Sequence, residues 1–296
     1  MSRAVAELSS GKGSGDENFP VASVLIHPRH RDVVLAFYKF ARTADDVADH
    51  ATASADEKLL LLDRMRRTIL GEDNVPEAMA LRSRLDAKNL TPQHALDLLE
   101  AFRRDVTKLR YRDWDDLMDY CRVSAMPVGR FVLDVHGESR TTWPASDALC
   151  SALQVINHLQ DCGKDYRALD RVYIPLDAFA AAGIGPDALG EARASAALRG
   201  IIAAMARRVS DLLGLSAPFS AQIRDHRLAC EVSVIQALAE DLNRRLMKRD
   251  PLSERVNHRK SDIVLRAIPA VLRFLATRRR RAYATASADE RRGGAG

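Results

Sequence analysis

One stretch of the chain, residues 37–49, restricts its fold more than any other. The sequence Phe-Tyr-Lys-Phe-Ala-Arg-Thr-Ala-Asp-Asp-Val-Ala-Asp predicts the last turns of a helix. Because successive residues of a helix are rotated by about 100°, Tyr38, Arg42, Asp45 and Asp49 share one stripe of it. Apolar side chains surround this stripe. We therefore expect a helix that is buried on nearly all sides and directs carboxylates into the protein interior.

A second stretch, residues 154–165, repeats this arrangement more than a hundred residues later. Here Gln154, Asn157, Asp161 and Asp165 form one stripe, again within apolar sequence. A buried carboxylate requires a cation or a hydrogen-bond donor. Oxygen ligands suit Mg²⁺, which keeps several waters and is usually completed by substrate phosphate. The four carboxylates of the two stripes are the expected ligands of two or three Mg²⁺ ions that hold a diphosphate: Asp45, Asp49, Asp161 and Asp165.

Acidic residues at helical spacing often form a solvated helix face, which is the alternative interpretation of these aspartates. Two such clusters, both embedded in apolar sequence, favour the metal site. Asp46 points away from the stripe and is expected either at the surface or behind the ligands. His158 lies at the edge of the second stripe, and we expect it to pack or to donate a hydrogen bond rather than to bind metal.

The two patterns resemble the aspartate-rich motifs of the squalene/phytoene synthase family. The first motif is Tyr38-x3-Arg42-x2-Asp45-Asp46-x2-Asp49, and the second is Asn157-x2-Gln160-Asp161-x3-Asp165. Residues 170–175 resemble the segment that follows the second motif, and residues 120–129 resemble the central helix of the family. The resemblance covers roughly residues 18–277. Residues 18–23 and 124–130 are most similar to the hydroxysqualene synthase branch of the bacterial hopanoid pathway.

This resemblance implies an all-α fold, a single helical bundle of the isoprenoid synthase type around a central cavity. The composition agrees, because Ala, Leu and Arg are frequent and no βαβ pattern occurs. The implied substrate is a prenyl diphosphate, and the implied cofactor is Mg²⁺. Arginine side chains suit phosphate, and a tyrosine could accept a proton. The expected catalytic residues, besides the metal ligands, are Tyr38, Arg42, Tyr120, Asn157, Arg171 and Tyr173.

The leading hypothesis for the reaction is ionisation and rearrangement of presqualene diphosphate, with water capture to give hydroxysqualene. The alternative is head-to-head condensation of two prenyl diphosphates to squalene or phytoene. Condensing members carry a basic segment before the first motif, where residues 15–19 offer two carboxylates and no cation. They usually have Ala-Gly where this chain has Ala-Met-Pro at 125–127, and a tyrosine where residues 231–243 have none. A non-catalytic assembly factor is disfavoured because both acidic pairs are intact.

The chain divides into three parts. Residues 1–17 are expected to be a flexible N-terminal segment, residues 18–277 a catalytic domain, and residues 278–296 a basic, disordered tail. A net charge of +5 does not indicate nucleic-acid binding, and no membrane-spanning helix is expected. Basic residues 278–281 are predicted to contact anionic lipid. We expect a cytoplasmic protein, peripheral at the inner membrane face, and the sequence gives no oligomeric state.

Several local features predict structure without deciding function. Pro127 is expected to kink its helix, and Gly163 suggests that another group approaches closely. Arg130 could reach a phosphate or lie at the surface. Asp105 falls where the family has an acidic residue, but a surface salt bridge is the alternative. Apolar spacing and capping residues predict helices over residues 55–70, 92–110, 114–135, 146–166, 191–215, 220–247 (with a break near 224) and 260–280.

Overall fold

The computed structural model describes residues 27–258, 269–272 and 274. Within these residues the chain is helical, and its only β-type pairing is an isolated bridge between Arg110 and Val172. The expected all-α fold is therefore confirmed. The expectations for residues 1–17 and 278–296, and for most of the helix over 260–280, lie outside the described residues.

The helices follow in chain order with short connections. They are α1 Pro28–Asp49, α2 Ala55–Leu70, α3 Pro76–Ala87, α4 Gln93–Thr107, α5 Trp114–Ser124, α6 Met126–Val135, α7 Trp143–Leu169, α8 Leu176–Ala181, α9 Ala196–Ser216, α10 Phe219–Gln222 and α11 His226–Leu246, with 3₁₀ turns η2 Arg140–Thr142 and η3 Pro186–Gly190.

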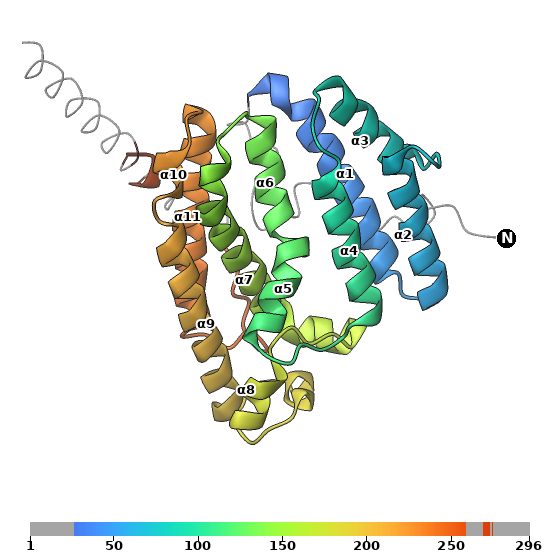
Figure 1. Ribbon diagram of the computed structural model, residues 1–296. Coiled ribbons are helices and arrows are strands. Elements are labelled where there is room, and N and C mark those ends of the chain that lie inside the picture. The colour runs from blue at the N-terminus through green and yellow to red at the C-terminus, as the bar shows by residue number, and fades with distance from the viewer. Residues whose placement is uncertain (1–26, 259–268, 273, 275–296) are drawn as a thin grey trace, which may run out of the picture.

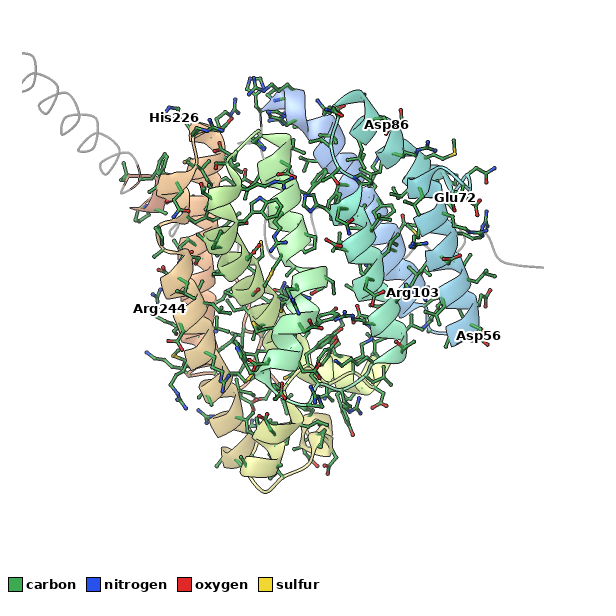
Figure 2. The ribbon with its side chains drawn as sticks, viewed as in Figure 1. Asp56, Glu72, Asp86, Arg103, His226 and Arg244 are labelled. Carbon is green, nitrogen blue, oxygen red and sulfur yellow. The ribbon has the colours of Figure 1, made fainter. Side chains whose placement is uncertain are left out.

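The bundle has two halves (Figure 1). In one half α1 packs against α2, α3 and α4, and in the other α7 packs against α9 and α11. Helix α6 lies between them and contributes to both apolar cores, with Phe131 and Val135 in the first and Leu133 in the second. The two motif helices, α1 and α7, therefore belong to opposite halves of one bundle. Charged side chains such as Asp56, Arg103 and Arg244 point outward (Figure 2).

Helix α1 is buried along most of its length, as its sequence predicts. Val33, Phe37, Phe40, Ala44 and Val47 are at most 5% exposed, whereas Leu35 is 38% exposed and shares an outer stripe with Asp32 and Lys39. Pro28 lies in the first turn of the helix. Backbone N–H groups there have no acceptor within the helix, so the N–H that proline lacks costs no hydrogen bond. The helix ends at Asp49, so the last carboxylate of the first motif lies at the carboxyl end of the helix.

The predicted single helix over 114–135 is two helices. Helix α5 ends at Ser124 and α6 begins at Met126, because Pro127 has no N–H to continue the hydrogen-bond ladder and its ring clashes with the preceding turn. The predicted kink is thus a full break. The second-motif helix begins at Trp143, earlier than predicted, since Pro144 fits its first turn. The anticipated break near residue 224 separates α10 from α11.

Two glycines allow close approach of neighbouring groups. A Cβ at Gly163 would lie 2.6 Å from Cδ2 of Leu252, which confirms the expected contact. A Cβ at Gly129 would lie 2.5 Å from Oγ of Ser146 and 2.6 Å from Sγ of Cys150. Both of these residues belong to α7, so Gly129 sets how closely α6 approaches α7.

We expect Gly129→Ala to lower the free energy of unfolding by about 1–3 kcal/mol, because the added methyl overpacks the α6–α7 interface. Gly200→Ala is the matched control: Gly200 is exposed in α9 and nothing lies within 4 Å of an added Cβ. There we expect stabilisation of up to about 1 kcal/mol from helix propensity. Chemical denaturation of both variants measures the difference, and equal stability of the two would contradict the close packing at Gly129.

Candidate active site

Two cavities lie within the bundle and meet at the first motif. The larger one, the apolar cavity, has a volume of about 460 Å³ and is lined mainly by aliphatic and aromatic side chains of α1, α6, α7 and α11. The smaller one, the polar cavity, has a volume of about 250 Å³ and is lined by residues of α1, α4, α5, α7 and the loop after α7. Asp45 and Phe102 line both cavities. The expected central cavity is therefore present as two adjoining cavities.

Most of the predicted site residues border these cavities. Tyr38 and Arg42 line the apolar cavity beside Asp45. Asn157 and Asp161 line neither cavity. The remaining predicted residues line the polar cavity from helices in both halves of the bundle: Asp45, Asp49, Tyr120, Asp165, Arg171 and Tyr173.

Arg42 organises the carboxylates of the first motif. Its guanidinium lies 2.9 Å from Oδ2 of Asp45 and 3.0 Å from Oδ1 of Asp46. Asp46 is only 7% exposed, so it supports Arg42 from behind the stripe. Burial, together with the charge of Asp49, raises the pKa of Asp45 to about 7, although Arg42 opposes this shift.

The second motif faces the first across the polar cavity. Burial raises the pKa of Asp165 to about 7, and the charges of Asp161 and Asp49 add to the shift. Asp49 belongs to α1 and Asp165 to α7, so carboxylates of the two halves repel each other in the interior. Asp161, one turn before Asp165, contributes to this repulsion without lining the cavity.

The donor chemistry fits Mg²⁺ that binds together with a diphosphate. Within the described part of the chain, no group of three or more His, Cys, Asp or Glu side chains is close enough to hold an ion without other ligands. Mg²⁺ does not need such a cage, because it keeps waters and uses one or two carboxylates plus substrate phosphates. A cation between α1 and α7 would relieve the repulsion among Asp45, Asp49 and Asp165.

Arg171 connects the loop after α7 to the end of α1. Its Nη1 donates to Oδ1 of Asp49 at 2.6 Å, its Nη2 to the carbonyl of Ala48 at 3.3 Å, and its Nε to the carbonyl of Asp105 at 3.0 Å. Arg171 is 7% exposed. The sequence placed Arg171 near the diphosphate site, and the structure shows that this side chain fixes the carboxyl end of α1.

The loop that carries Arg171 is held on both sides. Asp170 ends α7 in a left-handed conformation, with φ of 50°. Beyond it, the N–H of Val172 donates to the carbonyl of Leu109 at 2.9 Å, and the N–H of Leu176 to that of Tyr111 at 2.9 Å. The loop is thereby tied to the segment between α4 and α5. The N–H of Arg171 also donates to the carbonyl of Asp165 at 3.2 Å, so the loop stays close to the end of α7.

Asp105 is a buried part of the site, and the surface salt-bridge interpretation is wrong. It is 5% exposed and accepts hydrogen bonds from the hydroxyls of Tyr120 at 2.9 Å and Tyr173 at 3.0 Å. Burial raises its pKa to about 6, while Arg171 and the two hydroxyls oppose the shift. The sequence indicated this placement, because Asp105 lies on the same face of α4 as residues 98 and 102, which face inward.

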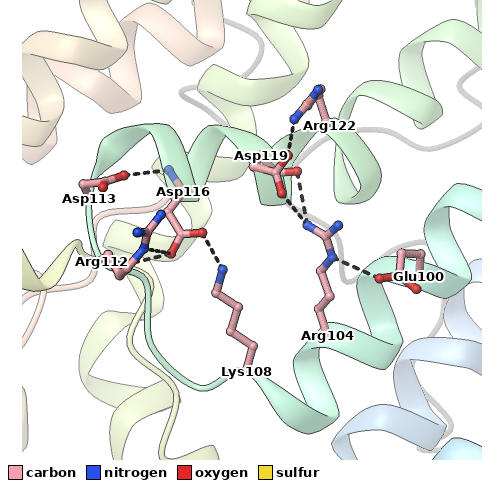
Figure 3. A network of polar contacts seen from close by, with 8 residues as sticks. All are labelled: Glu100, Arg104, Lys108, Arg112, Asp113, Asp116, Asp119 and Arg122. Carbon is pink, nitrogen blue, oxygen red and sulfur yellow. Dashed lines mark hydrogen bonds and ion pairs between the residues drawn. The ribbon is translucent and has the colours of Figure 1, made fainter.

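Ion pairs on the outer faces of α4 and α5 fix how these helices deliver Asp105 and Tyr120 to the cavity (Figure 3). Arg104, next to Asp105, donates to Asp119 at 2.8 Å, and Asp119 precedes Tyr120. Lys108 pairs with Asp116 at the start of α5. Adjacent residues of a helix point in different directions. The ion pairs therefore fix how α4 and α5 lie relative to each other, and so where Asp105 and Tyr120 enter the cavity.

His158 packs in the site as a neutral ring, as expected. It stacks on Tyr173 with ring centroids 3.5 Å apart and planes inclined by 12°. Burial, followed by the charge of Arg171, lowers the pKa of His158 to about 3. Its Nε2 lies 3.0 Å from Nε2 of Gln154. Arg130, by contrast, pairs with Asp147 at 2.9 and 2.6 Å and covers the ring of Trp143, so it ties α6 to α7.

We expect Asp165→Asn to stabilise the protein at pH 8 in the presence of EDTA. The pKa of Asp165 rises from 3.8 to about 7 on folding. The protonated Asp165 side chain favours the folded state, and this contribution to stability is complete below pH 4. It is lost as the pH rises through 7, because the buried carboxyl then becomes charged. Asparagine stays neutral, so we expect a gain of about 1 kcal/mol at pH 8 and none at pH 4, with solvent screening limiting the size.

Thermal unfolding at both pH values measures this difference. Asp211→Asn is the control, because Asp211 is exposed on α9 and its replacement should change stability by less than about 0.5 kcal/mol. Equal effects of Asp165→Asn at the two pH values would contradict the raised pKa.

Comparison with known proteins identifies the family. Residues 13–262 match the squalene/phytoene synthase family. The chain is 57% identical to a hydroxysqualene synthase of Rhodopseudomonas palustris, with 90% of this chain and 91% of the relative covered. It is also 57% identical to a hydroxysqualene synthase of Zymomonas mobilis, with 87% and 88% covered.

A solved structure leads to the same assignment. The crystal structure of squalene synthase HpnC from Alicyclobacillus acidocaldarius is similar, with a TM-score of 0.67 and 33% identity, over 80% of this chain and 89% of that one. The span of the family match includes the aspartates that face each other from α1 and α7. The chain belongs to the squalene/phytoene synthase family.

Proposed function

We propose that this protein is a hydroxysqualene synthase. It ionises presqualene diphosphate with Mg²⁺, rearranges the resulting cation, and captures water to release hydroxysqualene and diphosphate. One observation carries this proposal: a carboxylate-lined cavity of about 250 Å³ adjoins, at Asp45 and Phe102, an apolar cavity of about 460 Å³. Such a site fits a substrate with an anionic end and a long hydrocarbon body. The names of the relatives at 57% identity support this reaction over others of the family.

The polar cavity holds the diphosphate in this proposal. Asp45, Asp49 and Asp165 would bind the metal, with Asp161 behind them. Bound Mg²⁺ would neutralise the diphosphate and stabilise it as a leaving group. Arg42 keeps Asp45 oriented and can turn a donor toward the phosphate. Because the guanidinium of Arg171 already donates to three protein oxygens, we assign Arg171 to positioning Asp49.

The aromatic groups of the polar cavity act as hydrogen-bond donors and as walls. Burial, followed by the charge of Asp105, raises the pKa of Tyr120 and of Tyr173 well above the ordinary range. Their hydroxyls therefore remain protonated and donate to Asp105. This assigns Tyr120 to holding the site together rather than to accepting a proton. Tyr38 lines the apolar cavity next to the first motif, and Asn157 supports the second motif from outside the cavities.

The apolar cavity protects the carbocation. Phe37 of α1 stacks on Phe131 of α6, with ring centroids 3.8 Å apart, and both rings line this cavity. Leu149 and Leu153 of α7 complete the same wall. An apolar wall excludes bulk water and so prevents early capture of the cation. The hydroxyl of the product then depends on a single water that the protein admits and orients.

Membrane association remains a prediction. No helix of the described residues is long and apolar enough to span a bilayer. We propose a cytoplasmic protein whose basic residues 278–281 contact anionic lipid at the inner membrane face, since substrate and product are both lipophilic. These residues lie outside the described part of the chain.

Single replacements of the metal ligands should abolish turnover but not folding. We expect Asp49→Asn and Asp165→Asn each to lower kcat/KM for presqualene diphosphate by about 10³-fold or more, because the leaving group loses charge stabilisation. Diphosphate release over a Mg²⁺ titration measures the loss, and circular dichroism checks the fold. Asp211→Asn serves as the unaffected control. Full activity of either variant would overturn the metal assignment.

The source of the product oxygen separates the two enzymatic hypotheses. We expect the purified protein to convert presqualene diphosphate to hydroxysqualene with Mg²⁺ and without a nicotinamide cofactor. In ¹⁸O-labelled water the label should appear in the alcohol, as mass spectrometry would detect. Efficient condensation of two farnesyl diphosphates, or squalene formation that requires NADPH, would refute the hydroxysqualene assignment and favour the condensing one.

A further inference from the structure

A carboxyl group lies in the wall of the apolar cavity, away from the aspartate motifs. Glu231 of α11 is 5% exposed. Leu228, Val232 and Ile235 of the same helix line this cavity beside it. Among the described residues that line the apolar cavity, only Asp45 and Glu231 carry carboxyl groups. A buried carboxyl is costly unless a donor or a cation compensates it, and the steps assigned so far do not use this one.

The proposed reaction needs a proton acceptor in the apolar cavity. The bond between carbon and the diphosphate oxygen breaks, and its electron pair leaves with the diphosphate. After rearrangement, a lone pair of water forms the new carbon–oxygen bond, which gives a protonated alcohol. One O–H bond must then break, with its electrons kept on oxygen and its proton passed to a base. Nothing is oxidised or reduced overall.

The other polar groups of this cavity are poorly suited to accept that proton. Arg42 is a cation, and Tyr38 lies beside the first motif, where the diphosphate is expected. Asp45 pairs with Arg42 and is proposed to bind metal. Burial raises the pKa of the Cys150 thiol to about 11, so this thiol stays protonated at neutral pH. Ser146 offers an uncharged hydroxyl. Glu231 is also placed on α11, in the half of the bundle opposite α1, whereas the diphosphate is expected beside α1 and the end of α7.

We propose that Glu231 orients the captured water in the apolar cavity and accepts the proton that it releases. This inference rests on the proposed function. A fixed carboxylate at this wall also favours cationic charge nearby, so water and cation are brought together on the α11 side of the cavity. Glu231 thereby determines that the cation ends as one alcohol and not as a mixture of alkenes or isomeric alcohols.

The test separates ionisation from water capture. Single-turnover reactions of presqualene diphosphate with Mg²⁺ follow diphosphate release and hydroxysqualene formation in wild type and in Glu231→Gln, which is nearly isosteric. General-base catalysis contributes about 10²–10⁴-fold, so we expect the hydroxysqualene formed per diphosphate released to fall about tenfold or more. Diphosphate release itself should stay within about threefold, because ionisation does not require this base.

Glu240→Gln is the matched control. Glu240 lies on the same helix, is exposed, and does not line the apolar cavity, so its replacement should change neither quantity. Glu231→Ala with added formate is the second variant, and keeps the test decisive if the glutamine variant is unstable. Formate should restore the hydroxysqualene share, because a small carboxylate can occupy the space that is left.

Each outcome has a distinct meaning. An unchanged product share in Glu231→Gln would show that the proton goes elsewhere, for instance to the departing diphosphate, and would overturn the inference alone. A parallel loss of diphosphate release and product, without formate rescue, would indicate a structural role and also overturn it. Absence of hydroxysqualene from the wild-type reaction would overturn the proposed function and this inference together.

Discussion

The contacts of Arg171 hold the two halves of the bundle together at the place where the motifs meet. One guanidinium joins the loop after α7 to the carboxylate of Asp49 on α1 and to a carbonyl of α4. The Arg171 side chain is 8% exposed and that of Asp49 37%, so the guanidinium is buried while the carboxylate lies at the border with solvent. Without it, the buried charge of Arg171, which opposes the repulsion between Asp49 and Asp165, would be lost. The polar cavity depends on this interaction.

The site is built at a cost in stability. Burial and mutual repulsion raise the pKa of Asp45 and Asp165 to about 7 and that of Asp105 to about 6. Each raised value means that the charged carboxylate disfavours the folded state. Two well-packed apolar cores on either side offset this cost. The arrangement is useful because a cation with a bound diphosphate would turn the repulsion into attraction, so substrate binding and stability are coupled.

Much of the fold could be predicted from the sequence, and the misses have identifiable causes. The 3.6-residue periodicity and the flanking caps located α2 over residues 55–70. The break of the helix over 114–135 was underestimated, because a proline can kink or end a helix depending on what packs beside it. The sequence left the role of Asp105 open. The same sequence pattern is compatible with an aspartate that faces solvent and with one that faces two tyrosine hydroxyls. No local sequence pattern indicated a function for Glu231, because its proposed role depends on the cavity that it lines.

By itself, the sequence determined which side chains share a helix face, because the helical repeat is a local property of the backbone. It therefore grouped Asp45 with Asp49 and Asp161 with Asp165, and suggested buried helices with inward carboxylates. Only the tertiary structure decided that Asp49 and Asp165 face each other across a cavity, while Asp161 lies behind it. It also decided that Arg171 binds protein oxygens from two other helices. Such contacts join residues more than sixty positions apart, and their geometry follows from how the two halves pack rather than from any local pattern.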